Sequence, residues 1–225
     1  MLDDIKSFWN EFAPEYYENQ LQSRTPIAEN LLVYLLQENI LPATHFLDLA
    51  GGSGRYLKIF EPYCSFYDLV DISDKMLTYA EQLKKSPHTQ LILSSQEDFF
   101  LKNLKSYDVV FSAMNPALDS FSQMKNFAQI KAKEHLILRM NFSRDSLFSP
   151  YESLETDLLL PMSINWLEQE NISYTQKKFS YSYEETISKA FFQEYFDDKA
   201  LTEKVFGKEM LKTNQIWTQY TLLRF

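Results

Sequence analysis

The feature of this sequence that most constrains its fold is a glycine-rich turn directly after a short apolar run. The chain holds only 4 glycines, and three of them, Gly51, Gly52 and Gly54, lie within four positions. Residues 45–50 predict a strand, and residues 55–62 predict the start of a helix. Glycine has no Cβ, so its backbone can approach a ligand closely, and the amides at a helix N-terminus favour a carboxylate or phosphate. The turn therefore predicts a ligand site between a strand and a helix.

Further short apolar runs alternate with helical patterns along the chain. After helices over residues 7–17 and 26–41, the expected strands are residues 45–50, 66–72, 90–93, 107–113 and 135–142, with helices over residues 74–85 and 119–130. Alternation at this spacing predicts βαβ units and a parallel sheet. The run over residues 135–142 is apolar almost throughout, as expected for a strand at the centre of a sheet.

The chain after residue 142 follows a less regular pattern. We expect a helix over residues 153–170, interrupted at Pro161, which lacks the N–H that a helix interior needs. The remaining expected elements are a strand over residues 172–183, helices over residues 184–197 and 201–208, and a final strand over residues 216–225. The aromatic side chains of this region are expected to pack in a core or a lid, or alternatively to line an apolar pocket.

Composition and charge narrow the class of protein. The net charge is −9, whereas nucleic-acid binders usually carry a basic face that neutralises phosphates. Cys64 is the only cysteine, so no internal disulfide can form, and His45, His88 and His135 are not at metal-ligand spacing. No run approaches the roughly 18 apolar residues that cross a bilayer, and residues 1–10 do not resemble a secretory signal. We therefore expect a cytoplasmic protein with no metal, nucleic-acid or membrane partner.

An acidic residue ends the second expected strand. Asp71 lies 17 residues after Gly54, and a carboxylate at this place in an α/β sheet can accept hydrogen bonds from both hydroxyls of a ribose. Such bonds to a charged acceptor contribute roughly 1.5–3 kcal/mol. Asp68, on the same strand, faces the other side and is expected to be exposed to solvent.

The turn departs from the fingerprint of dinucleotide-binding proteins. That fingerprint is G-x-G-x-x-G or G-x-G-x-x-A. Gly52 and Gly54 supply its first two positions, but Leu57 occupies the third. The mismatch argues against a nicotinamide or flavin site, and an oxidoreductase is the least favoured alternative.

Two segments of the chain resemble the class I S-adenosylmethionine-dependent methyltransferases. The first motif of that family is acidic-x-Gly-x-Gly-x-Gly, and Asp48, Ala50, Gly52 and Gly54 follow its spacing, with Ala50 in place of the first glycine. The segment over residues 70–77, VDISDKML, resembles the end of the second strand in the same family.

This resemblance implies a fold and a cofactor. The implied fold is α/β, a doubly wound, mostly parallel seven-stranded sheet with helices on both faces and an antiparallel C-terminal strand. The implied organisation is one domain over residues 1–225, with a helical cap at 1–42, a cofactor-binding core at 43–142 and a substrate-side region at 143–225. The implied cofactor is S-adenosylmethionine, held by Asp48, Ala50, Gly51, Gly52, Gly54, Asp71, Ile72, Met76, Gln96, Glu97, Met114, Tyr16 and Tyr17.

The resemblance also implies where the two ends of the cofactor lie. In the family, the loop after the third strand contacts the adenine, often through an aspartate. Ser95 stands at that position here, so the contact is expected from Gln96, Glu97 or Asp98. At the other end, an aromatic N-terminal helix covers the cofactor in many small-molecule methyltransferases, and Tyr16 or Tyr17 is expected to reach the methionine carboxylate, with Arg24 as a further candidate.

The end of the fourth strand bears on the acceptor. In the family this strand end lies beside the reactive methyl group, and the branch that methylates bases has Asn/Asp-Pro-Pro-aromatic there. This chain has Asn115-Pro116 followed by Ala117-Leu118, without the aromatic that would stack on a flipped-out base. We interpret Asn115-Pro116 as a rigid turn or, alternatively, as a wall of the acceptor site.

The sequence therefore predicts methyl transfer to a small-molecule acceptor that it does not identify. The alternatives are a module that binds the cofactor without catalysis and, less favoured, a nucleic-acid methyltransferase. The sequence indicates no catalytic residue, since a general base is needed only if the acceptor atom must lose a proton, and it does not indicate the oligomeric state.

Overall fold

The computed structural model describes residues 2–153 and 158–225. The chain divides into two compact units, which are described separately. The first unit comprises Met1–Arg139, Leu158–Lys177 and Thr221–Phe225, and the second comprises Met140–Asp157 and Lys178–Tyr220. The single domain expected over residues 1–225 stays a prediction. No helix of the described residues is both long enough and apolar enough to span a membrane.

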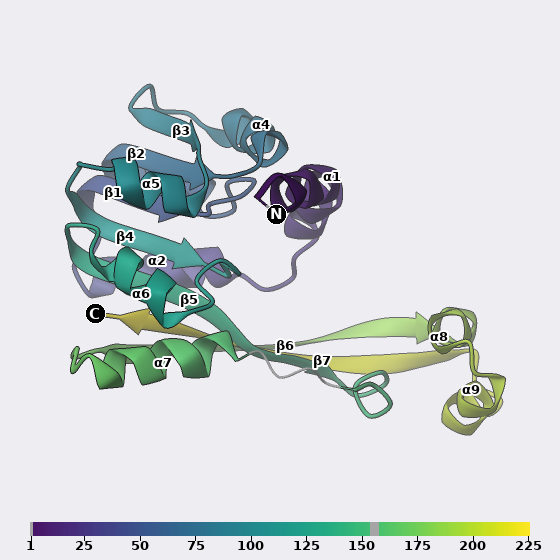
Figure 1. Ribbon diagram of the computed structural model, residues 1–225. Helices are drawn as coiled ribbons and strands as arrows, with labels where there is room; N and C mark the ends of the chain where they lie inside the picture. The colour runs from purple at the N-terminus through teal and green to yellow at the C-terminus, as the bar shows by residue number, and fades with distance from the viewer. Residues whose placement is uncertain (1, 154–157) are drawn as a thin grey trace. The chain divides into compact units, whose positions relative to one another are not determined.

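Seven strands form one sheet in the order β3-β2-β1-β4-β5-β7-β6 (Figure 1). The pairs β1–β2, β1–β4, β2–β3 and β4–β5 are parallel. β7 runs antiparallel to β5, because His135 and Phe225 exchange two backbone hydrogen bonds of 2.9 and 3.1 Å. The strands are β1 (Ala43–Leu49), β2 (Cys64–Asp71), β3 (Thr89–Leu93), β4 (Tyr107–Ala113), β5 (Ala132–Asp145), β6 (Thr175–Ser188) and β7 (Leu211–Arg224). The predicted fold class is confirmed.

The strand order places the glycine-rich turn at a special point of the sheet. From β1 the chain builds outward through β2 and β3, and it then returns to build β4 and β5 on the other side of β1. In open α/β sheets, ligands bind outside the carboxyl ends of the strands at the point where the order reverses. Residues 50–54 follow β1 at that point.

Apolar side chains on one face of the sheet pack against α5, α6 and α7 (Figure 1). Leu47, Val110 and Ile137 from three adjacent strands are fully buried in this cluster together with Phe127 of α6 and Leu167 of α7. The helices of the first unit are α1 (Leu2–Leu21), α2 (Ile27–Gln37), α3 (Leu57–Phe60), α4 (Asp74–Leu83), α5 (Gln96–Lys102), α6 (Phe121–Ala128) and α7 (Leu159–Gln169).

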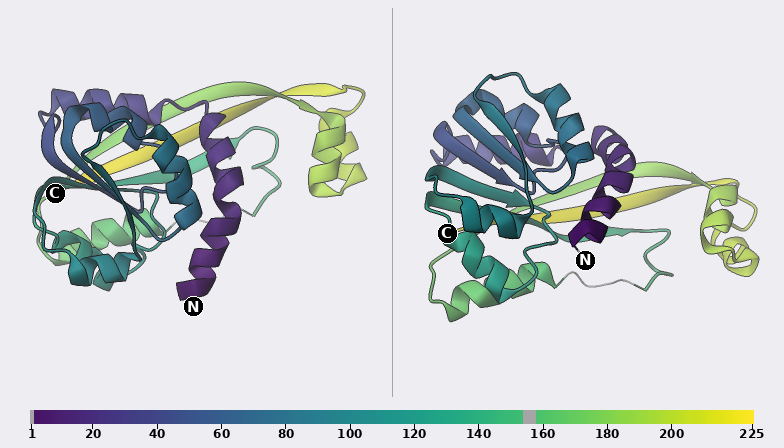
Figure 2. Two further views of the ribbon diagram at one scale, coloured as in Figure 1. Left: turned by 90° about the horizontal axis from the view of Figure 1, so that it is seen from above. Right: turned by 45° about the horizontal axis from the view of Figure 1, so that its top comes forward.

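α2 lies on the opposite face of the sheet (Figure 2), and aromatic side chains pack on that face. Successive residues of a strand point to opposite faces, so Phe46 lies opposite its neighbour Leu47. The Phe46 ring stacks on Tyr67 with centroids 5.0 Å apart and meets Phe60 edge-on at 5.7 Å. Both faces of the parallel strands are therefore covered, as expected for a doubly wound sheet.

The second unit contains the outer parts of β5, β6 and β7 together with two short helices, α8 (Lys189–Phe196) and α9 (Lys199–Phe206). Its own apolar cluster is Leu147, Phe148, Ile187, Phe192 and Phe206. Part of the aromatic set of this region therefore packs in a small core of its own, as one of the two interpretations of the sequence expected.

Two predicted helices of the C-terminal region differ from the structure. The helix expected over residues 184–197 begins only at Lys189, because β6 continues to Ser188 and the Ser188 hydroxyl caps α8 by accepting a hydrogen bond from the Phe191 amide at 3.1 Å. Of the helix expected over residues 153–170, α7 covers only Leu159–Gln169, and residues 154–157 lie outside the described residues. Pro161 lies in the first turn of α7, where a missing N–H is tolerated, and does not interrupt it.

Serine side chains cap the N-termini of three helices that follow parallel strands. The hydroxyls of Ser73, Ser95 and Ser120 accept hydrogen bonds from the backbone N–H groups three residues further on. Ser73 differs from the other two because its hydroxyl also donates a 2.6 Å hydrogen bond to the side chain of Asn10, which lies on α1. It thereby joins the start of α4 to the N-terminal helix.

We predict that Ser73→Ala lowers the free energy of unfolding by about 1–2 kcal/mol, because it removes a helix cap and the hydrogen bond that the buried hydroxyl donates to Asn10. Ser120→Ala is the matched control, since its hydroxyl makes only a longer cap bond of 3.4 Å to Gln123. Chemical denaturation of both variants measures the difference. Equal losses in the two variants would show that the Asn10 contact contributes nothing.

Candidate functional site

Three residues of the turn after β1 adopt positive φ angles. These are Ala50 at 57°, Gly52 at 56° and Gly54 at 82°. Gly51 meets a different constraint, because a Cβ at this position would lie 2.6 Å from the Leu69 side chain. The Gly51 amide donates to the backbone oxygen of Val70 at 3.1 Å. The turn is therefore pressed against β2, and only residues without a side chain allow this approach at Gly51.

Asp71 ends β2 and fixes the turn from that side. One carboxylate oxygen accepts the Gly52 amide at 2.9 Å, and the other accepts the Ser73 amide at 2.9 Å. The side chain is almost buried, with 8% exposed. Burial raises the pKa of Asp71 to about 6, and the backbone N–H groups of Ser73 and Gly52 limit that rise. Each carboxylate oxygen can accept further hydrogen bonds, so Asp71 is suited to hold two hydroxyl donors.

Asp48 is a second buried carboxylate, on β1. One of its oxygens accepts a 2.9 Å hydrogen bond from the Tyr67 hydroxyl, and the other accepts none from the described residues. Burial raises the pKa of Asp48 to about 7; the Tyr67 hydrogen bond lowers it, and the charge of Asp71 raises it further. Its carboxylate lies directly under Gly51, where it packs against the glycine turn.

A cavity of about 630 Å³ opens at the carboxyl ends of β1, β2 and β4. Its lining includes most of the residues that the sequence assigned to a cofactor, namely Tyr16, Ala50, Gly52, Asp71, Ile72, Met76, Gln96, Glu97 and Met114. Residues far apart in the sequence, from α1 to the loop after β4, therefore surround one space. Their individual roles in binding remain predictions.

Four of the predicted residues do not line this cavity. Asp48 lies behind the turn, and Gly51 is the turn residue that packs against Asp48 and Leu69. Gly54 allows α4 to approach, because a Cβ there would lie 3.3 Å from Ala80. Tyr17 stacks on Tyr79 of α4 with ring centroids 4.4 Å apart. Asp48, Gly51 and Gly54 therefore shape the wall of the cavity from behind, and Tyr17 holds α1 against α4.

α1 supplies lining residues that the sequence analysis did not assign to the site. They are Leu2, Asp4, Ile5, Phe8 and Trp9, which precede Tyr16 on the same helix. Residues three or four positions apart lie on one face of a helix. This spacing is the sequence signal that could have assigned them to the site. Two hydrogen bonds hold the helix in place, one from Ser73 to Asn10 at 2.6 Å and one from Ser53 to Gln20 at 2.7 Å.

A polar network fixes the loop after β4. Asn115 donates to Gln96 at 2.7 Å, and Gln96 in turn donates to the backbone oxygen of Ala117 at 3.1 Å. Arg139, which is 1% exposed, donates to the backbone oxygens of Asn115 at 2.5 Å and Leu118 at 3.1 Å. The sequence analysis missed Arg139, which lies inside an apolar strand pattern. Asn115 and Pro116 both line the cavity, so the loop is at once a rigid turn and a wall.

Two polar residues differ from their sequence-based predictions. Asp68, expected to be exposed, is 4% exposed because it accepts hydrogen bonds from Lys105 at 2.7 Å and Tyr107 at 3.0 Å. Asp98, one candidate for the adenine contact, forms an ion pair with Lys102 at 3.1 Å and does not line the cavity. Among the described residues, no group of three or more His, Cys, Asp and Glu side chains is placed to hold a metal ion.

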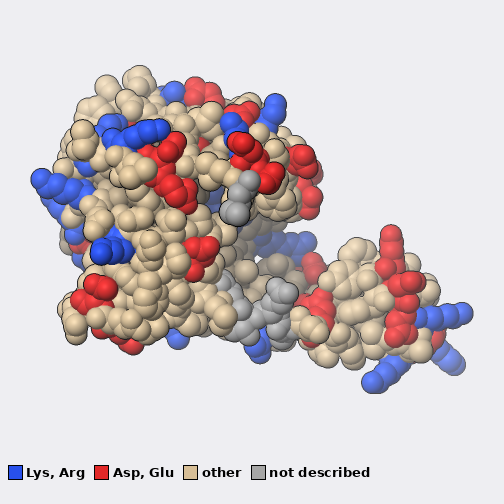
Figure 3. Space-filling view, in the orientation of Figure 1, with Lys and Arg blue, Asp and Glu red and all other residues tan. Residues whose placement is uncertain are grey.

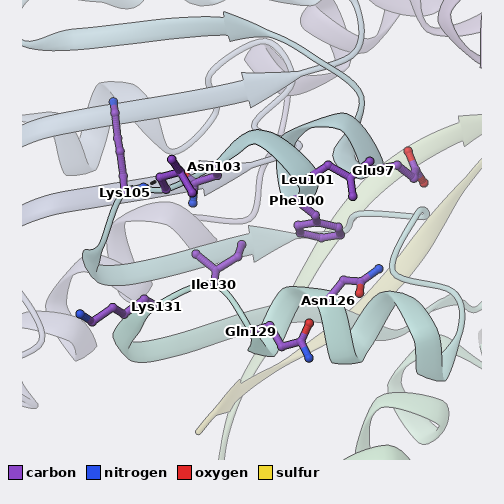
Figure 4. A pocket seen from close by; sticks show the side chains of 10 residues that line it. Glu97, Phe100, Leu101, Asn103, Lys105, Asn126, Gln129, Ile130 and Lys131 are labelled. Atoms are coloured by element: carbon purple, nitrogen blue, oxygen red, sulfur yellow. Dashed lines mark hydrogen bonds between the residues drawn. The ribbon is translucent and has the colours of Figure 1, made fainter.

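A second cavity, of about 520 Å³, lies between α5 and α6 (Figure 4). Its lining includes Phe100 and Leu101 of α5, Gln129 beyond α6, and Lys105 and Lys131 shortly before β4 and β5. Most of it thus faces the amino ends of these strands. Because ligands of doubly wound sheets bind at the carboxyl ends, the cavity at the glycine turn is the candidate site.

Two solved structures share the fold of this chain. The magnesium protoporphyrin IX methyltransferase ChlM of Synechocystis PCC 6803 with bound SAH (S-adenosylhomocysteine) has 9% sequence identity and a TM-score of 0.58, covering 97% of this chain and 98% of that chain. The DhpI–SAH complex has 11% identity and a TM-score of 0.53, covering 98% and 95%. At these identities the likeness establishes the fold.

One family model matches the core of the chain in sequence. Residues 47–144 match the model of the methyltransferase domain family, although no curated protein matches the chain in sequence. The matched segment contains the glycine turn, Asp71 and the loop after β4. The fold is Rossmann-like. The matched segment, which is less than half of the chain, is similar to a methyltransferase domain.

The raised pKa of Asp48 generates a prediction about stability. Because the folded-state pKa is about 7 and the ordinary value is 3.8, the folded protein binds this proton more tightly than the unfolded chain. Stability therefore falls as pH rises from about 4 to about 7, by at most about 1.4 kcal/mol per pH unit. Asp48→Asn keeps an acceptor for the Tyr67 hydroxyl and removes the titration. We expect the variant to gain stability relative to the parent as pH rises through this range.

Denaturant unfolding of both proteins at several pH values between 4 and 8 measures this difference. Asp71 titrates in the same direction in both proteins, so its contribution largely cancels. Parallel stability curves for parent and variant would contradict the shifted titration of Asp48.

Proposed function

We propose that this protein is an S-adenosylmethionine-dependent methyltransferase that transfers the methyl group to a small-molecule acceptor, which binds beside the cofactor in the cavity at the glycine turn. The observation that carries the proposal is the cavity itself. Its volume of about 630 Å³ falls within the roughly 300–1,000 Å³ of sites for small organic molecules. The chain's own helix α1 forms one wall, and the carboxyl ends of three strands form the base.

Asp71 is the proposed partner of the cofactor ribose. Its two oxygens already accept one backbone N–H each, from Gly52 and Ser73. These bonds fix the carboxylate with its remaining acceptor capacity available to the cavity, which matches two adjacent hydroxyls. Gly52 has space for a ligand, since a Cβ built on it would meet only the Tyr16 ring, at 3.8 Å.

Glu97 and Tyr16 are the proposed contacts at the two ends of the cofactor. Both side chains line the cavity. Gln96 is less suited to bind adenine, because its amide already bonds to Asn115 and Ala117. Tyr16 is preferred over Tyr17 for the methionine end, because Tyr17 stacks on α4. Bound S-adenosylmethionine supplies an activated methyl group, and the protein then contributes mainly the positioning of the two reactants.

A nucleic acid fits this chain less well than a small molecule. The net charge of −9 opposes binding to a phosphate backbone. The loop after β4 presents Pro116 and Ala117 to the cavity, while Leu118 is fully buried, so the loop offers no aromatic ring for an extruded base.

We expect Asp71→Asn to weaken binding of S-adenosylhomocysteine about 10- to 100-fold, as for the loss of about 1.5–3 kcal/mol of hydrogen bonding to a charged acceptor. In the parent, the affinity falls as pH drops below about 6, where Asp71 becomes protonated. This pH dependence should be absent from the variant. Titration calorimetry between pH 5 and pH 8 measures both effects.

Asp98→Asn is the matched control for the charge change. Asp98 lies near the site, on α5, but its carboxylate pairs with Lys102 and does not line the cavity. The affinity of the Asp98→Asn protein for S-adenosylhomocysteine should equal that of the parent protein. Unchanged affinity in a folded Asp71→Asn protein would reject the ribose role.

The size of the acceptor is testable without knowing its identity. With methyl-labelled S-adenosylmethionine, a cell extract should yield label in its low-molecular-mass fraction, because the volume of the cavity suits a small organic molecule. The nucleic-acid and protein fractions should remain unlabelled. Label found mainly in either macromolecular fraction would overturn the proposal.

A further inference from the structure

The charged residues that line the cavity all carry the same sign. They are Asp4, Asp71, Glu97 and Asp119, and no Lys, Arg or His is among the described lining residues. Lys6, on the same helix as Asp4, and Lys105, which follows α5, do not line the cavity. Lys6 pairs with Asp74 at 3.3 Å, and Lys105 pairs with Asp68 at 2.7 Å. The cavity therefore offers an anionic group no counter-charge.

Three of these acids lie beyond the proposed ribose site and come from three parts of the first unit. Glu97 is the proposed adenine contact, so Asp4 and Asp119 are the acids left for the acceptor. Asp4 belongs to α1, Glu97 to the first turn of α5, and Asp119 to the loop between β4 and α6. The surface view shows acidic side chains over both α1 and α5 on this face (Figure 3). The negative charge thus surrounds the cavity on several sides.

The wall formed by α1 is apolar and partly aromatic. Leu2, Ile5 and Phe8 line the cavity although 49%, 46% and 58% of each residue is exposed. Phe8 packs edge-on against Trp9, with ring centroids 5.3 Å apart. Pro116 and Ala117 supply further apolar surface from the loop after β4. Aromatic faces together with carboxylates attract organic cations, because the ring quadrupole and the negative charges act in the same direction.

We propose that the acceptor is an amine with an apolar or aromatic body, which enters the cavity as an ammonium ion. This inference rests on the proposed function of the same cavity. Opposite charges attract each other more strongly at the surface of a protein cavity than in bulk water. The two acids that the cofactor does not use, Asp4 and Asp119, therefore select an ammonium ion over a carboxylate or phosphate of the same shape.

An amine also satisfies the chemistry of transfer. The ammonium ion first gives one proton to water, which leaves a lone pair on nitrogen. That lone pair forms the new N–C bond to the methyl carbon, and the bond from this carbon to sulfur breaks with its electron pair remaining on sulfur. The products are the N-methylated ammonium ion and S-adenosylhomocysteine, so atoms and charge balance.

Binding to the protein saturated with S-adenosylhomocysteine tests the inference. This form contains no sulfonium, so any remaining preference for a cation belongs to the acceptor space. The probes are arylalkylamines of increasing size, beginning with phenethylamine, each paired with the matching alcohol and carboxylate (phenethyl alcohol and phenylacetate). We expect at least one amine to bind more tightly than both of its partners, and calorimetry measures the affinities.

Asp119→Asn is the decisive variant, and Glu170→Gln is its control for net charge. Asp119 lines the cavity, whereas the exposed Glu170 follows α7 and does not. Removing the Asp119 charge should weaken amine binding about fivefold, the equivalent of about 1 kcal/mol, and leave the alcohol unchanged. Added salt should weaken binding of the amine, and binding of the uncharged alcohol should not change. Glu170→Gln should behave as the parent.

With S-adenosylmethionine, the amine that binds best should become labelled and its carboxylate partner should not. The inference is overturned if no amine binds more tightly than its carboxylate partner, or if Asp119→Asn leaves amine binding unchanged. Failure of S-adenosylhomocysteine to bind would instead reject the proposed cofactor site, so the two failures are distinguishable.

Discussion

The site depends on the hydrogen bonds that the Asp71 carboxylate accepts from the amides of Gly52 and Ser73. These two bonds join the turn after β1 to the start of α4 and leave the carboxylate directed at the cavity. Ser73 extends the connection, because its hydroxyl contacts Asn10 on α1. One acidic side chain thus holds together the base of the cavity, a helix N-terminus and, indirectly, the helix that forms the outer wall.

Placing two carboxylates in this region has an energetic cost. Burial raises the pKa of both Asp48 and Asp71, and the charge of Asp71 adds to the effect on Asp48. The cost is limited by donors, which are the Tyr67 hydroxyl for Asp48 and backbone amides for Asp71. Buried charge that is only partly compensated often marks a functional site, and here it lies beneath the proposed cofactor and not beside the acceptor.

The proposed acceptor side of the cavity is formed by apolar side chains and a rigid loop. α1 keeps apolar side chains exposed toward the cavity, while the loop after β4 is held rigid by Arg139 and Asn115 from within. A firm loop on one side and an apolar helix on the other define a space that a small organic molecule can fill. The acids around this space then determine which charge is favoured there.

The sequence by itself determined the sheet, the glycine turn and Asp71, because strand periodicity, glycine placement and a carboxylate at a strand end are local patterns. It could not place Asp48 behind the turn, tie up Gln96 in a loop network or bury Asp68 against Lys105. It also missed Arg139 and the part played by Phe8 and Trp9. Those facts depend on which side chains meet across strands and helices distant in sequence, and only the tertiary structure decides such contacts.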